Sequence, residues 1–409
     1  MKRNLLIVTP VFPRWENDAE SPRSITDLAR ALSQYYRVYV LCPGTYCAAN
    51  KEHLGDVTII RFNYFFPVKW QALSSGQGMF AHNKLKSFAK LQLPFYFISE
   101  ILNLYRAIRQ YDIHIVNSHY IFPEGLSYSI IRNFLKRPHV ITLHSPGVDE
   151  LIRHGIIGKI IARFILKHAD KILPVSTYVR YKLERLSAMH FNYKVIPLAL
   201  DIDDFKYTPE KDKMRRHIGL EKNRTYFLFT GALVERSGIF VLLRAMEQLK
   251  KEYTDFSVIV IGNGPLKSKI AKWITQYQLN DHCIFHTLAT HERISHYYAA
   301  CNAVIAPIII DAEGATDGMP SSVQEGLACG VPVIASRLSG VNDLIKHGVN
   351  GWLFEPGNHS ELAECMALLF KPLKLKKLKT SAQKTAERYD SETVANQYYD
   401  IFKTFYRIS

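Results

Sequence analysis

The chain has 409 residues, more than one ordinary hydrophobic core accommodates, which indicates two or three domains. Apolar residues make up 47% and charged residues 22%, a balance that excludes wholesale disorder. Lys and Arg outnumber Asp and Glu by 52 to 37, a formal net charge of +15. A basic surface of this kind favours an anionic partner, such as nucleic acid, an anionic membrane or a phosphorylated substrate.

The cysteine pattern and the apolar runs bear on the compartment. The six cysteines show no Cys-x-x-Cys spacing, so we expect neither a disulfide framework nor a zinc site and favour a reducing compartment. Residues 1–9 hold only four apolar residues before Thr9, too few for a signal-peptide core and typical of a first strand. No uncharged apolar run approaches the roughly 18 residues of a membrane span. We therefore expect a cytoplasmic protein.

Short apolar runs rich in β-branched residues alternate with helical stretches along the whole chain. Most of these runs are continuous rather than alternating, as in strands that are covered on both faces. Alternating strands and helices predict right-handed βαβ units, and hence two α/β, Rossmann-like domains with parallel sheets. The predicted strands are 5–9, 38–42, 57–62, 114–117, 140–143, 172–175 and 194–197 in the first half, and 226–230, 258–262, 283–286, 303–307, 331–335 and 352–354 in the second.

The boundary between the two domains is expected after residue 197, in the acidic, turn-prone segment 201–205. The first domain then covers 1–200 and the second 206–388, with a closing helix in 389–409 that returns to the first domain. The Lys-rich stretch 371–384 indicates a solvated helix face. Ser391 is predicted to start a last amphipathic helix. Ligands of open α/β sheets bind beyond the carboxyl ends of the strands, so we expect a ligand in a cleft between the domains.

The most informative stretch runs from Asp317 to Glu325, Asp-Gly-Met-Pro-Ser-Ser-Val-Gln-Glu, and places two acids eight positions apart across a strand-to-helix turn. Ser321 and Gln324 have the spacing of a capping box, which predicts that a helix begins there. The first backbone N–H groups and the dipole of such a helix attract phosphate. The two carboxylates could then hold hydroxyls on either side of that phosphate.

This stretch, with the segments around it, resembles the retaining family 4 (group 1) glycosyltransferases of GT-B fold. The resemblance continues in Cys-Gly-Val-Pro-Val-Ile-Ala-Ser after Ala328 and in Val-Asn-Gly-Trp-Leu-Phe-Glu-Pro-Gly after Gly348. Further likenesses are the turn 261–265, the interdomain segment 194–205, and the strands 117–125 and 140–144. The resemblance covers nearly the whole chain and implies two Rossmann-like domains facing each other across a cleft.

The resemblance also implies a role for individual residues of the second domain. Asp317 replaces the family's first glutamate, beside the transferred sugar, and Glu325 matches the second, which holds the nucleotide ribose. The turn between them meets the diphosphate. The further residues that it places at the donor are Gly231, Gly262, Gly264, Gly318, Met319, Pro320, Ser321, Ser322 and Val323.

In the first domain, His144 matches the family's donor-sugar histidine and His119 another cleft histidine. Asn117 stands where that strand often carries a histidine as well. The first loop, 10–24, lacks the glycine pair that many members place against the phosphate. It offers Arg14 and Arg23 instead, which we expect at the acceptor or in the cleft.

The sequence departs from the family where two basic residues usually neutralise the diphosphate. Ala232 replaces the arginine and Ser237 the lysine, while Arg236 stands one position before the usual lysine, and we expect it to take over their role. A charge-assisted contact to phosphate contributes about 1.5–3 kcal/mol, so losing two without replacement would weaken leaving-group stabilisation by orders of magnitude. The family needs no metal, and the sequence shows no Asp-x-Asp site other than Asp201 and Asp203, which turn chemistry explains.

Segment 62–109 is rich in aromatic residues and poor in acids. Such a composition suits a helix on an anionic membrane surface, although the same aromatics could equally form core. No nucleic-acid-binding module is recognisable, and no nucleic-acid partner is expected. The residues that define the pattern are Lys69, Trp70, Lys84, Lys86, Lys90, Phe95, Tyr96 and Phe97.

The sequence therefore predicts an enzyme that moves a sugar from a UDP- or GDP-linked donor to a lipid-linked or saccharide acceptor, with retention and without a metal or cofactor. Such an enzyme would serve the synthesis of cell-surface glycans, lipopolysaccharide among them, as a peripheral protein on the inner face of the cytoplasmic membrane. Ala232 and Ser237 motivate an alternative, a non-catalytic GT-B protein that binds a nucleotide sugar or a partner glycosyltransferase. A nucleotide-sugar epimerase on the same fold is a third hypothesis, and would form product from the donor alone.

Overall fold

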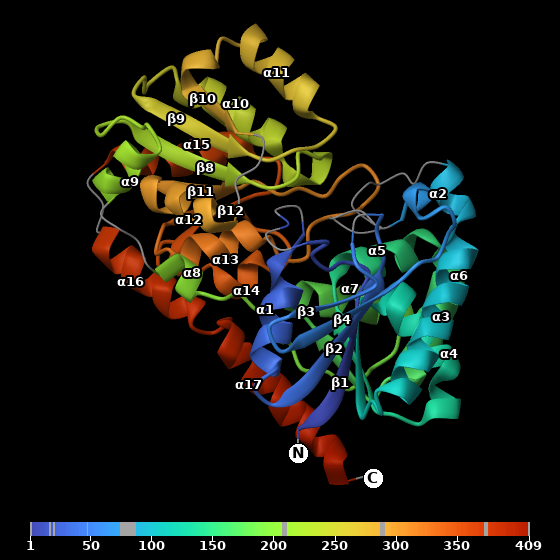
Figure 1. The fold of residues 1–409 in the computed structure, drawn as a ribbon. Coiled ribbons are helices and arrows are strands. Elements are labelled where there is room, and N and C mark those ends of the chain that lie inside the picture. Colours follow the sequence, from blue (N-terminus) through green and yellow to red (C-terminus); the bar gives the residue numbers. More distant parts are fainter. Residues whose placement is uncertain are drawn as a thin grey trace. The chain divides into compact units, whose positions relative to one another are not determined.

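The computed structural model describes residues 2–15, 18, 21–46, 48–73, 87–206, 211–286, 291–371 and 375–407. The chain forms two compact units. Unit 1 comprises residues 1–200 and 391–409, and unit 2 comprises residues 201–390. Each unit is a parallel α/β sheet with helices on both faces (Figure 1).

Unit 1 holds a seven-stranded sheet in the order β3-β4-β2-β1-β5-β6-β7. All neighbouring strands are parallel except β3 and β4. The central strands β1, β5 and β6 are buried along most of their length because helices cover both faces of the sheet. The strands are β1 (Arg3–Val8), β2 (Tyr36–Pro43), β3 (Lys51–Leu54), β4 (Val57–Phe62), β5 (Ile115–His119), β6 (His139–Leu143) and β7 (Lys171–Pro174).

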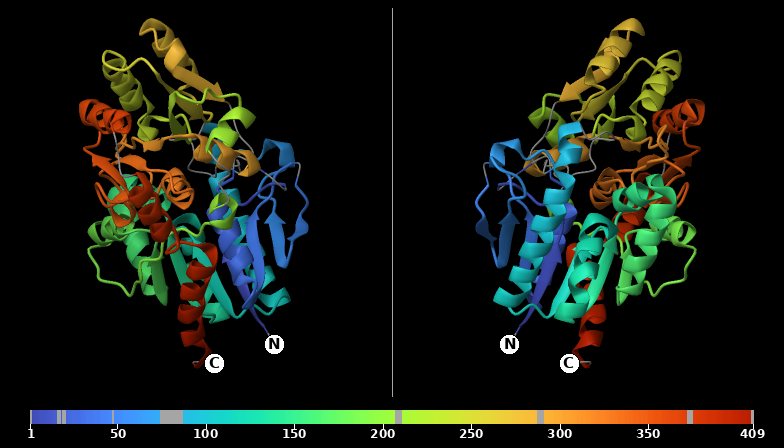
Figure 2. Two further views of the ribbon diagram at one scale, coloured as in Figure 1. Left: turned by 90° about the vertical axis from the view of Figure 1, so that its left-hand side faces the viewer. Right: turned by 90° about the vertical axis from the view of Figure 1, so that its right-hand side faces the viewer.

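Two groups of helices cover the sheet of unit 1. On one face α1 packs against the closing helix α17, where Tyr35 stacks on Tyr399 with ring centroids 4.6 Å apart. On the other face α4 lies between α3 and α6 (Figure 2). These helices are α1 (Arg23–Leu32), α2 (Ser87–Leu91), α3 (Leu93–Gln110), α4 (Leu126–Leu135), α5 (Ser145–Arg153), α6 (Gly155–Lys167), α7 (Thr177–Ser187) and α17 (Ser391–Phe402).

Unit 2 holds a six-stranded parallel sheet in the order β10-β9-β8-β11-β12-β13. Its core lies between the sheet and α10, α11 and α15, and α13 packs against α16 on the opposite face. Gly326 allows α13 to approach the sheet, because a Cβ there would lie 2.9 Å from the Val304 side chain. The strands are β8 (Thr225–Thr230), β9 (Phe256–Ile261), β10 (Cys283–His286), β11 (Ala303–Ala306), β12 (Val333–Ser336) and β13 (Gly351–Phe354). The helices are α8 (Asp203–Lys206), α9 (Lys211–His217), α10 (Ile239–Leu249), α11 (Lys267–Gln276), α12 (His291–Ala300), α13 (Ser321–Ala328), α14 (Val341–Leu344), α15 (His359–Ala367) and α16 (Leu375–Ala386).

One predicted strand of unit 1 is wrong, and one strand was not predicted. Segment 194–197 is extended, and the N–H groups of Lys194 and Ile196 donate to β7, but it forms no strand of the sheet. Pro197 has no N–H and cannot continue the ladder. The seventh strand is instead β3, a short polar strand joined to β4 by a turn at Gly55, whose φ is +58°. Its polar composition gives no strand signal.

Helix α13 begins at Ser321, as the sequence predicted, but without a capping box. Pro320 occupies the N-cap position, and no described side chain caps the helix. Ser321 is therefore the first helical residue rather than the cap.

The aromatic residues of 62–109 divide between core and surface: Tyr96 is fully buried in α3, whereas Phe95 and Trp70 are exposed. Lys84 and Lys86 lie outside the described residues.

Candidate functional site

The candidate site of unit 2 lies where the strand order reverses, between β8 and β11. The loops that follow these two strands meet there, as open α/β sheets require of a ligand site. The Ile309 N–H donates to the Arg236 carbonyl at 2.9 Å. Gly238, with φ +71°, permits this approach, because a Cβ would lie 1.6 Å from the Pro307 carbonyl oxygen. The loops after β8 and β11 therefore form one continuous structure.

An ion pair joins the same two loops through their side chains. Arg236 Nε donates to Asp317 Oδ1 at 2.9 Å. The Arg236 side chain is 15% exposed and that of Asp317 is 39% exposed, so the carboxylate remains accessible. The sequence singled out both residues separately, and the structure brings them together.

Of the two positions that lack the family's usual basic residues, Ser237 takes part in the structure of its own loop. The Ser237 hydroxyl donates to the Val234 carbonyl at 2.6 Å and closes the 3-10 turn Glu235–Ser237. Ser237 is buried, so its hydroxyl is used within the loop. Among the described residues of this loop, Arg236 is the basic side chain.

The start of α13 completes this edge of unit 2. The loop before it is fixed by the Gly340 N–H, which donates to the Gly318 carbonyl at 3.0 Å. Ser322 and Val323 are buried, whereas Ser321 is exposed at the first turn. Because no described side chain caps the helix, its first N–H groups and its positive dipole end suit an anion.

Glu325 is held by a tyrosine that the sequence did not mark. The Tyr298 hydroxyl donates to Glu325 Oε2 at 2.6 Å and lies 2.9 Å from the Thr230 hydroxyl at the end of β8. Burial, with the nearby Glu325 charge, holds the pKa of Tyr298 well above its usual value. Tyr298 is thus a neutral donor that orients the carboxylate. Its partner lies 27 residues away in the chain, a separation that no local motif reports.

The glycines predicted at the donor have a packing reason in this structure. A Cβ on Gly262 would lie 2.0 Å from the Gly231 carbonyl oxygen, and one on Gly264 would lie 2.5 Å from the Leu233 carbonyl oxygen. The turn after β9 therefore packs backbone to backbone against the loop after β8. Met319 and Pro320, also predicted at the donor, are buried in the loop before α13.

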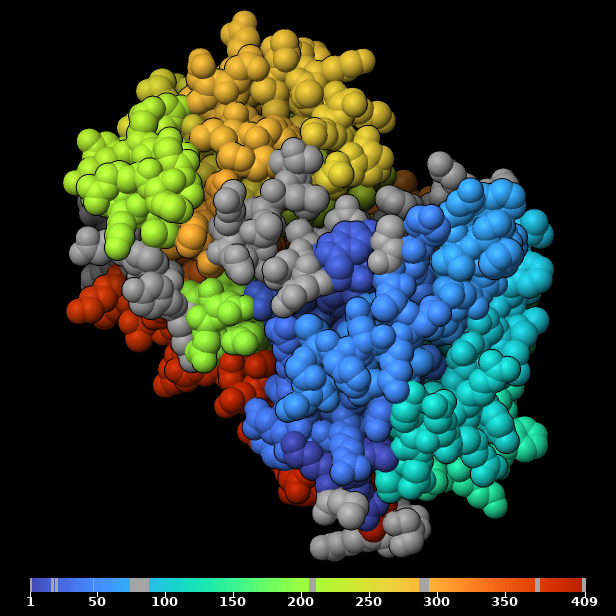
Figure 3. Space-filling model, in the orientation of Figure 1, coloured from blue at the N-terminus to red at the C-terminus, as the bar shows by residue number. Residues whose placement is uncertain are grey.

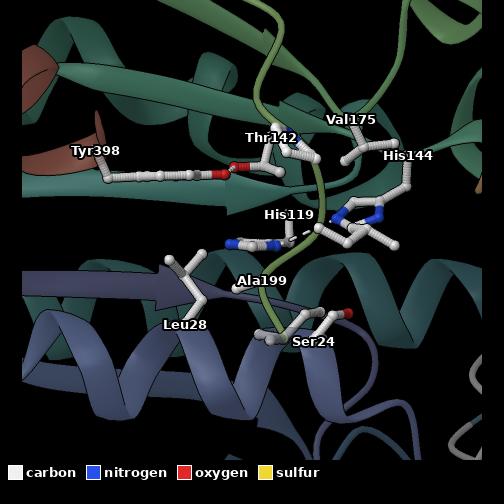
Figure 4. A pocket seen from close by; sticks show the side chains of 11 residues that line it. Ser24, Leu28, His119, Thr142, His144, Val175, Ala199 and Tyr398 are labelled. Atoms are coloured by element: carbon white, nitrogen blue, oxygen red, sulfur yellow. Dashed lines mark hydrogen bonds between the residues drawn. The ribbon is translucent and has the colours of Figure 1, made fainter. Parts of the chain in front are cut away.

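A second candidate site lies in unit 1, at the carboxyl ends of β5 and β6. His119 Nδ1 and His144 Nε2 are 3.2 Å apart (Figure 4). Tyr120 stacks on the His144 ring, with ring centroids 4.4 Å apart. Burial lowers the pKa of His144 to about 3, and burial together with His144 holds that of His119 well below its usual value. Both rings are therefore neutral near pH 7, when one donates a hydrogen bond to the other.

The histidine pair borders a small pocket. His119 Nε2 is buried and has no hydrogen-bond partner among the described residues. The pocket is shaped from the other side by α1 and by the closing helix, where Tyr398 lies 2.8 Å from the Thr142 hydroxyl (Figure 4). Asn117 donates to that same hydroxyl at 3.1 Å, so it ties β5 to β6. The pocket is lined by Ser24, Ile25, Leu28, His119, Thr142, His144, Val175, Pro197, Leu198, Ala199 and Tyr398.

Arg14 and Arg23, which the sequence placed at the acceptor or in the cleft, each pair with an acid of unit 1. Arg14 Nε and Nη2 donate to the two oxygens of Asp18 at 2.8 and 2.7 Å. Burial raises the pKa of Asp18, but the hydrogen bonds from Arg14 and Ser21 outweigh it and bring that pKa to about 2. Arg23 Nη2 lies 3.8 Å from Asp27 Oδ1 on α1.

The described residues contain no cluster of three or more His, Cys, Asp or Glu side chains that could hold a metal ion. Nor do the helices that the structure describes include one that is both long and apolar enough to cross a membrane.

Comparison with known proteins identifies the family. Residues 21–204 match the model described as Glycosyltransferase Family 4, and residues 210–386 match the model described as Glycosyl transferases group 1. The two matches together span most of both units. The chain belongs to the group 1, family 4 glycosyltransferases and has the GT-B fold.

Individual relatives are distant. An uncharacterized glycosyltransferase of Methanocaldococcus jannaschii is 27% identical over 68% of this chain and 73% of its own length. A putative teichuronic acid biosynthesis glycosyltransferase of Bacillus subtilis, TuaC, is 26% identical over 64% of this chain and 63% of its own. Among solved structures, Anabaena HepE in complex with UDP superposes with a TM-score of 0.72 at 18% identity, over 99% of this chain and 100% of that one.

Proposed function

We propose that this chain transfers a sugar from a nucleotide diphosphate sugar to a lipid-linked or saccharide acceptor, with retention of configuration, in the synthesis of a cell-surface polysaccharide. The observation that carries the proposal is the arrangement around α13. Asp317 and Glu325 lie on either side of the N-terminus of α13, at the reversal point of the sheet. TuaC, whose name is that of a putative teichuronic acid biosynthesis glycosyltransferase, supports the assignment.

Unit 2 is assigned to the donor. The first turn of α13 would donate hydrogen bonds from its backbone N–H groups to the diphosphate. Glu325, oriented by Tyr298, would accept hydrogen bonds from ribose hydroxyls. Asp317 would take a sugar hydroxyl, while Arg236 fixes its carboxylate. HepE binds UDP, which supports a UDP-linked donor here.

We propose that this chemistry proceeds without a metal. Negative charge develops on the leaving diphosphate, and fixed dipoles stabilise such charge without reorganising. The N-terminus of α13 would supply these dipoles, and Arg236 would supply the positive charge. The neutral pair His119 and His144 of unit 1 suits an uncharged sugar hydroxyl. Either ring can form a hydrogen bond to such a hydroxyl while it stays neutral, so no charge is buried.

Unit 1 is assigned to the acceptor, and the protein to the inner face of the cytoplasmic membrane. A net charge of +15 supports attraction to anionic lipid. The exposed aromatic side chains Trp70 and Phe95 in segment 62–109 are consistent with contact at a lipid surface.

Isothermal titration with a panel of UDP- and GDP-sugars tests the donor assignment. We expect one donor to bind, and Glu325→Gln to weaken it by about tenfold or more, because a charged hydrogen bond to the ribose is lost. Arg236→Ala should also weaken binding, whereas Glu364→Gln on the exposed side of α15 should leave it unchanged. The anomeric configuration of the product, read by NMR, tests retention. Absence of binding to every donor would refute the proposal.

Two side chains of the loop after β8 already have partners within unit 2, which favours a second candidate function. This candidate is a protein that binds a nucleotide sugar without turnover. The Ser237 hydroxyl is used by Val234, and Arg236 pairs with Asp317. In that case a donor would bind in the titration, but no acceptor would yield product and no donor would be hydrolysed.

A further inference from the structure

Helix α6 of unit 1 exposes a row of large apolar side chains. Ile156, Ile157 and Ile160 are 79%, 65% and 62% exposed, and Phe164 continues the row one turn further along. The opposite side of the helix packs normally, with Ala162 and others in the core of the unit. The exposed row therefore takes no part in the internal packing of unit 1.

The neighbouring helices extend this surface. On α4, Ile130 and Phe134 are exposed, Phe134 at 78%. On α3, four exposed residues recur at helical spacing and form one outward stripe. The three helices connect parallel strands on the same face of the sheet and therefore run in the same direction (Figure 2). The α3 stripe consists of Phe95, Ile98, Leu102 and Tyr105.

The charges on this face have one sign. The sequences of α4 and α6 contain no acid, and the one acid of α3, Glu100, is buried on the inner side. Exposed bases accompany the apolar rows at Arg106, Arg109, Lys136, Arg163 and Lys167.

Acids near the ends of the three helices are neutralised by arginines. Asp112 pairs with Arg137 at 3.1 Å, and Asp170 with Arg132 at 2.6 Å. Glu150, on the preceding helix α5, pairs with Arg153 at 2.7 Å. The outer face of α3, α4 and α6 is therefore apolar and basic together (Figure 3 shows part of it, in cyan).

We propose that this outer face, hereafter the α3–α4–α6 face, docks on an anionic phospholipid bilayer. Isoleucine and phenylalanine side chains would enter the acyl boundary, and lysine and arginine would reach the headgroup phosphates along their apolar stems. Docking would bring the enzyme to a lipid-linked acceptor, and only this purpose rests on the proposed function. It extends the contact from segment 62–109 to α4 and α6.

The charges favour a membrane over a second copy of the chain as the occupant. Two copies joined through the α3–α4–α6 face would set basic helices against basic helices without an exposed acid on any of the three. An anionic bilayer offers the complementary charge and an apolar interior together. Attraction to it should weaken as salt screens the headgroups, whereas the apolar contribution should persist.

Vesicle sedimentation of the full chain, without nucleotide, tests the proposal. We expect binding to vesicles of equimolar phosphatidylcholine and phosphatidylglycerol and much weaker binding to pure phosphatidylcholine. Ile156→Ser with Ile157→Ser and Ile160→Ser should lower binding by about tenfold or more, because three exposed apolar side chains are lost. Val349→Ser, at a half-exposed valine of unit 2, is the matched control and should bind as the unmodified chain does.

A second pair of variants tests the charge. Lys167→Glu on α6 should weaken binding to the anionic vesicles about fivefold, whereas Lys377→Glu on α16 should not. Full binding by the triple serine variant, or none by the unmodified chain, would overturn the proposal. So would a dimer in sedimentation velocity that the triple serine variant disrupts, since the occupant would then be a second copy. Titration with the donor, run on the same variants, reports the proposed function separately, because unit 2 is untouched.

Discussion

Arg236 holds the side chain of Asp317, the acid that stands in this chain where the family has its first glutamate. The family's first glutamate is one methylene longer, and here an arginine one position away from the usual lysine holds the aspartate at 2.9 Å. In the loop where Ala232 and Ser237 replace the family's basic residues, Arg236 thus joins the loops after β8 and β11.

Asp317→Asn should separate catalysis from donor binding. The amide keeps the size of the side chain but loses the charge that Arg236 holds, so we expect turnover to fall by about 10²–10³-fold. Nucleotide affinity should stay within about threefold, because the assigned partner of Asp317 is the sugar. Steady-state kinetics and titration with UDP measure the two quantities. An equal loss in both would show that Asp317 acts on the nucleotide instead.

Tyr298→Phe should weaken nucleotide binding through Glu325. The carboxylate would lose a neutral donor at 2.6 Å, a net loss of about 1–1.5 kcal/mol that corresponds to roughly tenfold in affinity. Titration with UDP measures it, and Tyr297→Phe, the same change one position earlier, is the control. If Tyr298→Phe lowers the melting temperature without changing affinity, the tyrosine is a packing residue alone.

At the scale of elements, Gly238, which follows the 3-10 turn Glu235–Ser237, decides how closely the loops after β8 and β11 approach each other. In Gly238→Ala the new Cβ would lie 1.6 Å from the Pro307 carbonyl oxygen, so the loops after β8 and β11 must separate. Gly314→Ala is a matched control, since it has a similar φ of +77° but open space around it. We expect about 1 kcal/mol for Gly314→Ala from its conformation alone and at least about 3 kcal/mol for Gly238→Ala. Urea denaturation measures both, and equal losses would show that the close approach is not maintained.

The sequence predicted the elements with strong apolar runs and the start of α13. It failed where long-range pairing decides. β3 is polar and becomes a strand only because β4 lies beside it, whereas 194–197 is apolar but ends at Pro197, which cannot donate to a ladder. The same reason explains the missed site residues. Tyr298 and Tyr398 have hydrogen-bond partners far along the chain, at Glu325 and Thr142.

The candidate residues that the sequence did name are set by topology rather than by local pattern. Asp317 and Arg236 are 81 positions apart and meet because β8 and β11 are neighbours at the reversal point of the sheet. His119 and His144 meet because β5 and β6 are neighbours. A fold assignment therefore predicts that such residues converge, but it does not predict the particular bonds that they make.

At the scale of the whole molecule, unit 1 carries a pair of buried carboxyls that couple its stability to pH. Glu100 on α3 and Glu124 before α4 lie between the sheet and the helices of the α3–α4–α6 face, both fully buried. Burial, only partly offset by a hydrogen bond from Ser127, raises the pKa of Glu100 to about 8. Burial and the nearby Glu100 hold the pKa of Glu124 well above its usual value.

The sign of the pH dependence follows from the direction of these shifts. Between the ordinary pKa of 4.5 and the folded value of about 8, folded unit 1 keeps a proton on Glu100 that the unfolded chain has released. Raising the pH in this range therefore lowers the free energy of unfolding, by up to about 1.4 kcal/mol per pH unit for each such carboxyl. The buried histidines His119, His139 and His144 have lowered pKa values and act in the opposite direction, but only below about pH 6.5.

Glu100→Gln should remove part of the pH dependence of the stability of unit 1. Between about pH 7 and pH 8 the histidines do not contribute to this dependence, so the effect of Glu100 can be measured by itself. The amide keeps the shape of the carboxyl and cannot ionise, so between pH 7 and pH 8 the slope of stability against pH should become less negative by about 1 kcal/mol per unit. Hydrogen exchange of α3 peptides measures it within unit 1, and Glu364→Gln on the exposed side of α15 in unit 2 is the control. An unchanged slope would mean that Glu100 is already ionised in the folded protein, so that the helices packed over it tolerate a buried charge.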